Sequence, residues 1–288
     1  MNAHLLVPAL VLLASLLSCA PNINPTPQSD THKLPPTDKS VSKYLALHVT
    51  DNRSSFRKMA LVADQGRTDQ SSGKSSDANS LSAVNKAIEL GLEFVRIDVR
   101  RIGNNNYCTD HIADGEEYPF FEHILSACRG KVFICMDATK SLHIPNTCSL
   151  IDSLSMQDEI IFFMGDLGGP GDNQEDSYGW RNYLAFSSRL DKVVPLFTAN
   201  SKEAVDFVER QDLPVVVSFI TDDLSMADYC HSYGFAVYTD ISSKDADIKN
   251  GDNTALKQAA AIKADLVCTG IANNDNVISY LNSNNLNK

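Results

Sequence analysis

From Met59 onward the chain repeats one unit, a short apolar run followed by a polar turn and an amphipathic helical pattern. Eight such units predict a closed parallel barrel covered by helices, a (β/α)8 TIM barrel of the α/β class. An open doubly wound sheet is the alternative, but no glycine-rich phosphate loop follows the first strand. The expected strands are 59–64, 94–102, 132–139, 160–165, 193–200, 214–221, 235–241 and 264–269. The expected helices are 80–90, 119–128, 146–154, 180–189, 202–210, 224–233, 254–263 and 276–282.

The N-terminal residues differ from this pattern and predict export. Residues 5–17 form an apolar run too short to span a bilayer, and the run ends in Leu-Leu-Ser-Cys19, as in bacterial lipoprotein signals. We therefore expect a signal peptide at 1–18 and a lipid on Cys19; a plain cleavable signal is the alternative. Residues 19–45 are rich in Pro, Asn and Ser and predict an unfolded tether, which leaves 46–288 as the barrel domain.

These features place the protein in the cell envelope, anchored to a membrane through its lipid. Ala20, and not Asp, follows the cysteine, which by resemblance to other lipoproteins indicates the outer membrane if the source is Gram-negative. The formal net charge of -11 argues against nucleic acid as a partner, because phosphate backbones are bound by surplus Lys and Arg. An anionic ligand would need a local cluster of cations.

The remaining cysteines show no zinc-ligand spacing. Two of them lie inside apolar strand-like runs and are expected to be buried thiols, whereas four others could pair in an oxidising compartment. The first two are Cys135 and Cys268, and the four are Cys108, Cys128, Cys148 and Cys230.

One predicted strand carries charged residues on a single face. Arg96, Asp98 and Arg100 alternate along 94–102, and His111 follows shortly after the strand. Two cations, a carboxylate and an imidazole suit a group that binds and cleaves a phosphodiester. A structural Arg/Asp pair beside a surface histidine is the alternative interpretation.

In a parallel barrel the active site lies at the carboxyl ends of the strands. Polar residues stand at most of these ends and predict a polar ring there. Asp166 and Asp222 are the members most typical of helix caps. The ring consists of Asp64, the charged face of 94–102, Lys140, Asp166, Asn200, Asp222, Tyr238 and Asp240.

Taken in order, these segments resemble the glycerophosphodiester phosphodiesterase family and its relatives of the phosphatidylinositol-specific phospholipase C type. Residues 59–66 (MALVADQG) stand where the family has a strand ending in His-Arg-Gly, and Arg96-Ile-Asp-Val99 stands at its Glu-x-Asp-Val. His111 falls on its second histidine. Residues 132–140 match the strand that ends in Glu-x-Lys, and 265–270 match its last strand.

The resemblance implies a barrel in which carboxylates hold a divalent metal and two histidines act as base and acid. Asp64 replaces the first histidine, and Ala78, Arg96 and Ala138 replace three metal-binding glutamates. Asp98, His111 and Lys140 are retained, so Asp98 is the one inherited ligand for Ca²⁺ or Mg²⁺, if any cation binds. Strand alternation is expected to turn Asp137 toward the helices.

Some bacterial phosphatidylinositol-specific phospholipases C use an arginine in place of the metal, and Asp98-Val-Arg100 followed by His111 resembles their motif. The resemblance implies that Arg100 or Arg96 binds the phosphate, with Lys140 as a further cation. His111 would be the general acid. Asp64 would be the base, with a pKa lowered by the neighbouring cations.

Three functions follow as hypotheses. The first is an exported hydrolase of glycerol- or inositol-phosphate diesters, acting on a small phosphodiester or a lipid headgroup. The second is a barrel that has lost catalysis and binds a phosphorylated or sugar ligand at the cell surface. The third is glycoside hydrolysis by two carboxylates of the ring.

Overall fold

The computed structural model describes residues 40–53, 58–68, 78–113, 115–137, 139 and 142–286, with side chains in the first of these ranges described to residue 49. The predicted signal peptide, Cys19 and most of the predicted tether lie outside these residues, and so does Lys140.

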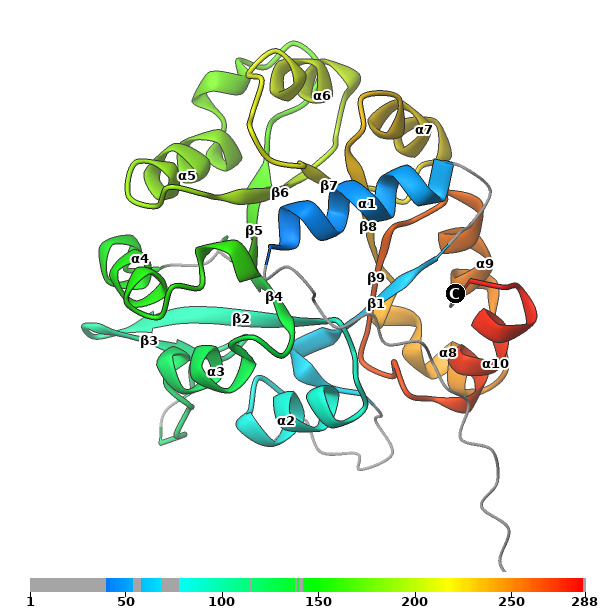
Figure 1. The fold of residues 1–288 in the computed structure, drawn as a ribbon, viewed down its shortest axis with the longest axis horizontal. Helices are drawn as coiled ribbons and strands as arrows, with labels where there is room; N and C mark the ends of the chain where they lie inside the picture. Colours follow the sequence, from blue (N-terminus) through cyan, green and yellow to red (C-terminus); the bar gives the residue numbers. More distant parts are fainter. Residues whose placement is uncertain are drawn as a thin grey trace, which may run out of the picture. The chain divides into compact units, whose positions relative to one another are not determined.

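Eight parallel strands close into a barrel, which confirms the predicted (β/α)8 TIM barrel (Figure 1). Neighbouring strands pair in parallel around the barrel, and β1 pairs with both β2 and β9, which closes it. Closure leaves no barrel strand with an unpaired edge. The strands are β1 (Ala60–Ala63), β2 (Phe94–Ile102), β4 (Phe133–Asp137), β5 (Ile160–Asp166), β6 (Val194–Thr198), β7 (Ser218–Ile220), β8 (Ala236–Asp240) and β9 (Leu266–Thr269).

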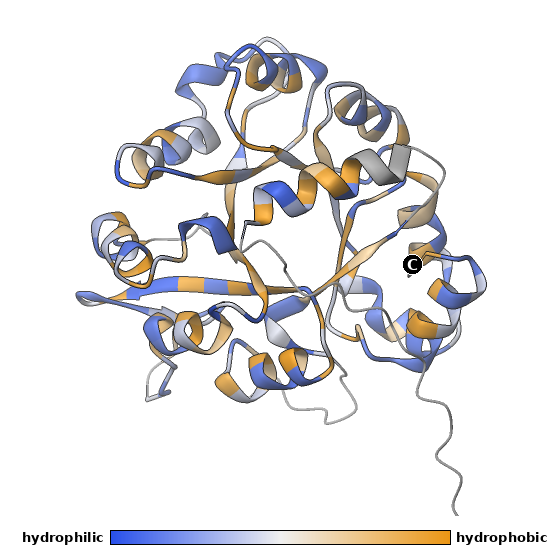
Figure 2. Ribbon diagram, in the orientation of Figure 1, coloured by the Kyte–Doolittle hydropathy of each residue, from blue (hydrophilic) through white to orange (hydrophobic). Residues whose placement is uncertain are grey.

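Helices surround the barrel with their apolar sides against it (Figure 2). Several begin at a side chain that accepts a backbone N–H of the first turn, such as Ser80, Ser201 and Asp223. The predicted helices are all present, and α8 (Asp245–Lys249) is an additional one. The others are α2 (Leu81–Glu89), α3 (Phe121–Cys128), α4 (Ile144–Ser153), α5 (Tyr178–Ser187), α6 (Lys202–Glu209), α7 (Leu224–Ser232), α9 (Thr254–Ala261) and α10 (Asp275–Ser283).

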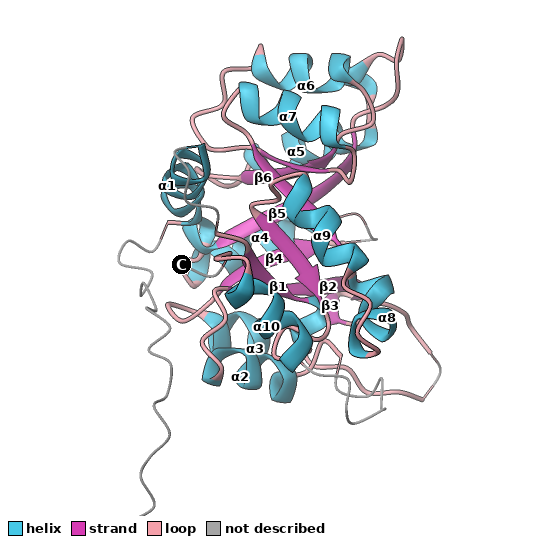
Figure 3. Ribbon diagram, turned by 90° about the vertical axis from the view of Figure 1, so that its right-hand side faces the viewer, coloured by secondary structure: helices cyan, strands magenta, loops and turns pink. Residues whose placement is uncertain are grey.

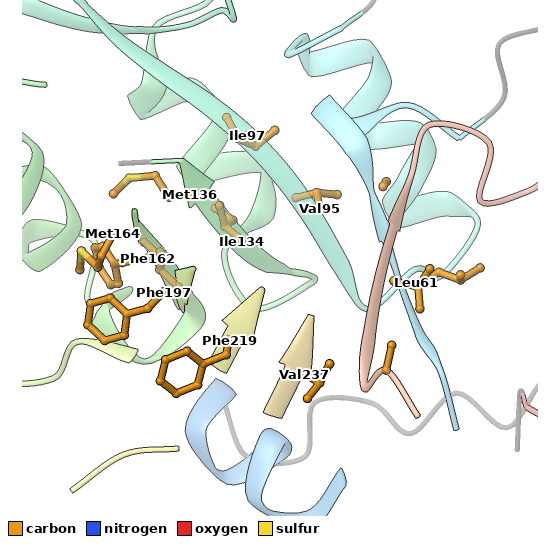
Figure 4. Close-up of a cluster of buried hydrophobic side chains, with 14 of the residues drawn as sticks. Leu61, Val95, Ile97, Ile134, Met136, Phe162, Met164, Phe197, Phe219 and Val237 are labelled. Atoms are coloured by element: carbon orange, nitrogen blue, oxygen red, sulfur yellow. The ribbon is translucent and has the colours of Figure 1, made fainter. Parts of the chain in front are cut away.

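Strand alternation divides the core into two clusters, because successive side chains point to opposite faces. The outward residues pack under the helices, and Figure 4 shows Val95 and Ile97 of β2 beside Ile134 and Met136 of β4. The inward residues fill the barrel and include Phe94. The colour bands that alternate along β2 in Figure 2 reflect this division.

Strand β2 extends beyond the barrel and forms a hairpin with β3 (Asn105–Cys108), which the sequence pattern did not predict. The polar Asn-Asn-Tyr-Cys run lacks the apolar alternation of the other strands. The hairpin folds the following loop back onto the barrel, since the Thr109 amide donates to the Asp98 carbonyl oxygen at 3.0 Å. The loop that carries His111 is therefore anchored to the end of β2.

Helix α1 (Val41–Arg53) packs against the amino ends of the strands, on the opposite side of the barrel from α8 (Figures 1 and 3). Val41, Leu45 and Val49 recur every fourth residue and pack into the inward cluster, which makes an amphipathic helix the stable structure here. The helix begins within the range predicted as a tether. The barrel domain therefore starts earlier than residue 46.

The packing of α1 leads to a testable prediction. Replacing the fully buried Leu45 with Ala should lower the free energy of unfolding by about 2–5 kcal/mol, because it leaves a cavity at the amino end of the barrel. Urea unfolding followed by circular dichroism measures this loss. Leu47→Ala on the same helix is the matched control, because Leu47 is 68% exposed and its truncation should change little. Equal effects of both substitutions would contradict the packing.

All six cysteines that the structure describes are buried free thiols, so the pairing considered for Cys108, Cys128, Cys148 and Cys230 is not present. Within the described residues, no helix combines the length and apolarity that crossing a bilayer requires.

Candidate active site

Four aspartates that surround Arg96 lie at the carboxyl ends of barrel strands, where parallel barrels place their active sites. Asp64 follows β1, and Asp98, Asp137 and Asp240 lie on β2, β4 and β8. The first three are buried, whereas the side chain of Asp240 is 32% exposed. We call this set the aspartate ring.

The guanidinium of Arg96 lies among the four carboxylates of the aspartate ring. Its Nη1 is 2.7 Å from Asp240 Oδ2 and 3.7 Å from Asp64 Oδ1. Its Nη2 is 3.6 Å from Asp98 Oδ1 and 3.5 Å from Asp137 Oδ2. Burial disfavours the charged guanidinium, but the acidic groups around it outweigh burial and raise the pKa of Arg96. Arg96 therefore points inward, as the alternation of β2 predicts.

The prediction that Asp137 faces the helices is wrong. Asp137 pairs in register with Asp98, and with Phe133 and Cys135 it belongs to the inward face of β4. The error came from counting the alternation beyond the last residue of the strand. Asp137 ends β4, and its Oδ1 accepts the Thr139 amide at 2.9 Å and the Thr139 hydroxyl at 2.6 Å, which turns the chain there.

Asp98 is held by two side chains, Asn79 and Gln65, to which the sequence pattern assigns no role. Asn79 Nδ2 donates to Asp98 Oδ2 at 3.3 Å, and Asn79 Oδ1 accepts the Asp98 amide at 2.9 Å. Gln65 Nε2 donates to the same carboxylate oxygen at 2.8 Å. Asn79 and Gln65 both have positive φ, which few residues other than Gly and Asn adopt. These backbone positions orient two amide side chains onto Asp98.

Asp64 forms an ion pair with Arg67. Arg67 lies two residues after Gln65, which stands where the motif of the resembled family has arginine. Arg67 Nη2 lies 2.5 Å from Asp64 Oδ2, and the Cys268 thiol lies 3.9 Å from Asp64 Oδ1. The pKa of Asp64 is raised, because the desolvation of its buried carboxyl outweighs the opposing fields of Arg96 and Arg67. The expectation that cations lower this pKa is therefore wrong in sign.

Asp245 is a further buried carboxyl, close to Arg67 and outside the aspartate ring. Its oxygens accept the Thr269 hydroxyl at 2.5 Å and the Gly270 amide at 2.9 Å. Burial raises the pKa of Asp245 to about 6, although these hydrogen bonds oppose the shift. A Cβ placed on Gly270 would lie 2.8 Å from the Asp245 carboxyl and 3.4 Å from the Arg67 guanidinium. Gly270 thus brings the last barrel strand close to both side chains.

The raised pKa of Asp245 predicts a pH dependence of folding. The unfolded chain, with its ordinary value of 3.8, loses this proton before the folded protein does. The stability that Asp245 contributes is therefore full below about pH 4 and is lost as the pH rises through about 6, by at most about 3 kcal/mol. Urea titrations from pH 4.5 to 7.5 should show this decline relative to Asp245→Asn, which has no proton to lose. A constant difference between the two proteins would refute the assignment.

Arg100 and His111 lie farther out, at the rim. Arg100 donates through Nη2 to the backbone carbonyl of Asp110 and has a buried Nε without a hydrogen-bond partner. His111 is 63% exposed, and its Nδ1 lies 2.5 Å from Asp110 Oδ1. Burial raises the pKa of Asp110, but the hydrogen bonds of His111 outweigh it and keep that pKa below its usual value. Gln65, which donates to Asp98, also contributes to lowering the pKa of Asp110.

Other predicted ring members have structural roles or lie outside the described residues. Asp166 Oδ1 accepts the Gly168 amide at 2.8 Å within a turn. The prediction that Asp166 and Asp222 cap the next helices is wrong, because Ser177 caps α5 and Asp223 caps α7. Lys140, the predicted further cation, is not among the described residues. Asp240 has two sets of contacts. Its Oδ2 accepts a hydrogen bond from Arg96, and its Oδ1 accepts hydrogen bonds from the amide and the hydroxyl of Ser242.

The residues present do not fit a divalent metal. Among the described residues, no group of three or more His, Cys, Asp or Glu side chains is arranged to hold an ion. A hard cation needs several oxygen ligands at short distance, whereas the carboxylates of the aspartate ring surround a guanidinium. Asp98 as a metal ligand stays a prediction, and its hydrogen bonds and ion pair account for it without an ion.

The fold is shared with glycerophosphodiester phosphodiesterases. No protein-family model and no curated protein matches the sequence. A phosphodiesterase from Oleispira antarctica, solved with the product sn-glycerol-3-phosphate, matches with a TM-score of 0.56 at 12% identity over 80% of this chain and 98% of its own. The glycerophosphodiester phosphodiesterase from Parabacteroides distasonis matches with a TM-score of 0.56 at 10% identity, over 79% of this chain and 98% of its own. The one from Agrobacterium tumefaciens matches with a TM-score of 0.54 at 11% identity, over 76% of this chain and 99% of its own. At these identities the likeness shows the fold alone, a TIM barrel that this chain has in common with these enzymes.

Proposed function

We propose that this protein hydrolyses phosphodiesters of glycerol- or inositol-phosphate compounds, as a divergent barrel that lacks several catalytic positions of the family it resembles. The observation that carries the proposal is the pairing of a half-buried cation with an Asp–His dyad at the carboxyl ends of the strands. Arg96 provides the positive charge, and Asp110 holds His111 by Nδ1. A phosphodiester carries one negative charge and requires both a cation and a proton donor.

Arg96 and Arg100 each have a guanidinium N–H that lacks a hydrogen-bond acceptor. Among the described residues, the Arg96 guanidinium makes one hydrogen bond, to Asp240 at 2.7 Å, and its Nε is buried without a partner. The Nε of Arg100 is also buried and unpaired. Buried donors without acceptors cost stability, so oxygens of a bound phosphate would satisfy groups that the protein leaves unsatisfied.

The reaction follows from these positions. Asp64, which its environment keeps easier to protonate than an ordinary carboxylate, takes a proton from an attacking water. The water oxygen bonds to phosphorus, and the bond from phosphorus to the leaving alcohol breaks, which leaves a phosphomonoester. His111 gives its proton to the departing oxygen, while Arg96 and Arg100 balance the charge on the phosphate oxygens.

A substrate panel tests the proposal. The protein should release product from a glycerophosphodiester, an inositol phospholipid or a chromogenic diester, and EDTA should leave the rate unchanged. Addition of Ca²⁺ or Mg²⁺ to the EDTA-treated protein should not raise it. Absence of product from all three, at protein concentrations that detect one turnover per hour, would refute hydrolysis.

A binding barrel without turnover is the second candidate, and the charge of the site favours it. Four carboxylates of the aspartate ring face Arg96, and Arg67 is already paired with Asp64. Such an excess of negative charge weakens the hold on an anion but suits the hydroxyl groups of a polyol or sugar phosphate. This candidate predicts a higher melting temperature with glycerol phosphate, inositol phosphate or a free sugar, without product. If none of them shifts the melting temperature, it fails.

For localisation, we propose attachment to the cell envelope through a lipid on Cys19, in the outer membrane of a Gram-negative source. The short apolar run that ends at this cysteine supports the proposal. Metabolic labelling with a radioactive fatty acid should mark the full-length protein and not Cys19→Ser. Equal labelling of both would exclude Cys19 as the attachment point.

A further inference from the structure

The aspartate ring brings like charges together that would repel one another without a cation. Asp64, Asp98 and Asp137 are buried, and each has an oxygen within 3.7 Å of the Arg96 guanidinium. Carboxylates gathered around one point in this way repel one another more strongly in a protein interior than in water. The ring needs a positive charge at its centre to keep its members ionised.

Arg96 can provide this positive charge, because its side chain reaches the aspartate ring from the barrel interior. It lies one inward position before Asp98 on β2, opposite the fully enclosed Cys135, so its guanidinium rises from the barrel interior between the four strand ends. Three of its four contacts, at 3.5 to 3.7 Å, are ion pairs and longer than ordinary hydrogen bonds. The charge of Arg96, more than directed bonding, holds the ring together.

We infer that Arg96 is the resident cation of this site and that the aspartate ring does not accept a divalent ion while Arg96 is present. The fold family implies a metal among strand-end carboxylates, and here the chain's own guanidinium fills that position. The inference is independent of turnover, because it concerns only which cation the carboxylates hold.

Calorimetric titration with CaCl₂ and with MgCl₂, alongside melting temperatures, tests the inference on the full chain after EDTA treatment. The wild-type protein should show no saturable site that involves the ring. Arg96→Met removes the charge and keeps much of the length, and it should melt lower than the wild type without metal. In millimolar Ca²⁺ the melting temperature of this variant should rise by about 5 °C or more, because the freed carboxylates now bind the ion.

Arg100→Met is the matched control, since it makes the same change of charge on the same face of β2 outside the ring. It should show no rise with Ca²⁺. If Arg96→Met does not fold, Arg96→Lys keeps a positive charge and should fold and stay insensitive to Ca²⁺.

Two results would overturn the inference. The first is a wild-type Ca²⁺ or Mg²⁺ site that Asp137→Asn abolishes, because the ring would then hold an ion beside Arg96. The second is a folded Arg96→Met protein that Ca²⁺ does not stabilise. Wild-type binding that Asp137→Asn leaves intact lies elsewhere on the chain and agrees with the inference.

Discussion

Replacing His111 with Ala should lower kcat for a glycerophosphodiester by about 10²–10⁴-fold, the usual contribution of a general acid. The loss should depend on the leaving group, because a nitrophenolate departs without a proton and a glycerol alkoxide does not. Steady-state kinetics on both substrates therefore tests whether His111 donates a proton to the leaving group. The rate with the chromogenic diester should fall far less.

His123→Ala is the control for this prediction, because His123 is an exposed histidine of α3 that contacts only the Phe120 ring among the described aromatic side chains. Its kcat should match the wild type. If His111→Ala loses the same factor on both substrates, or loses nothing, the imidazole is not the proton donor.

Asp265→Ala should produce the largest loss of stability, about 3–5 kcal/mol in the free energy of unfolding. Asp265 is fully buried at the amino end of β9, where its Oδ2 accepts the Val237 amide at 2.8 Å and contacts His231 Nε2 at 3.0 Å. His48 of α1 lies 3.9 Å from its other oxygen. The substitution leaves buried polar groups without their acceptor, and these are costly in a low-dielectric interior.

Urea unfolding measures this loss against two controls. Asp265→Asn retains an acceptor of similar shape and should lose clearly less. Asp228→Ala removes an exposed carboxylate 3.8 Å from Lys263, and a surface pair of this kind contributes at most about 1 kcal/mol. A loss below 1 kcal/mol for Asp265→Ala would contradict its place in the core.

The barrel could be predicted because each strand and each helix has a recognisable pattern of apolar residues in its own stretch of sequence. Apolar runs of strand length alternate with amphipathic helices from Met59 to the end, and the closure of eight parallel strands follows from that repetition. Arg96 and Asp98 could be assigned to the inward face for the same reason. The period of two residues on β2 is unbroken, so the face of each side chain is determined by position alone.

The remainder of the site depends on where strands end and on contacts between distant segments. The face of Asp137 is not predicted correctly, because the alternation holds only within a strand, and positions 138 and 140 lie beyond the end of β4. The charge state of Asp64 depends on burial, which no local pattern reveals. Asn79 and Arg67 reach the site through turns of particular backbone conformation. The cluster of His48, His231 and Asp265 joins three segments that have no sequence relation.

The position of α1 determines on which side of the barrel a label or fusion partner joined to the amino-terminal side of the domain would lie. Because α1 packs against the amino ends of the strands, the chain enters the barrel on the side away from the aspartate ring (Figure 3). A bead, a dye or a fusion partner joined ahead of Ser40 would therefore sit behind the barrel. Such a conjugate leaves the strand-end face open to solvent and accessible to ligands.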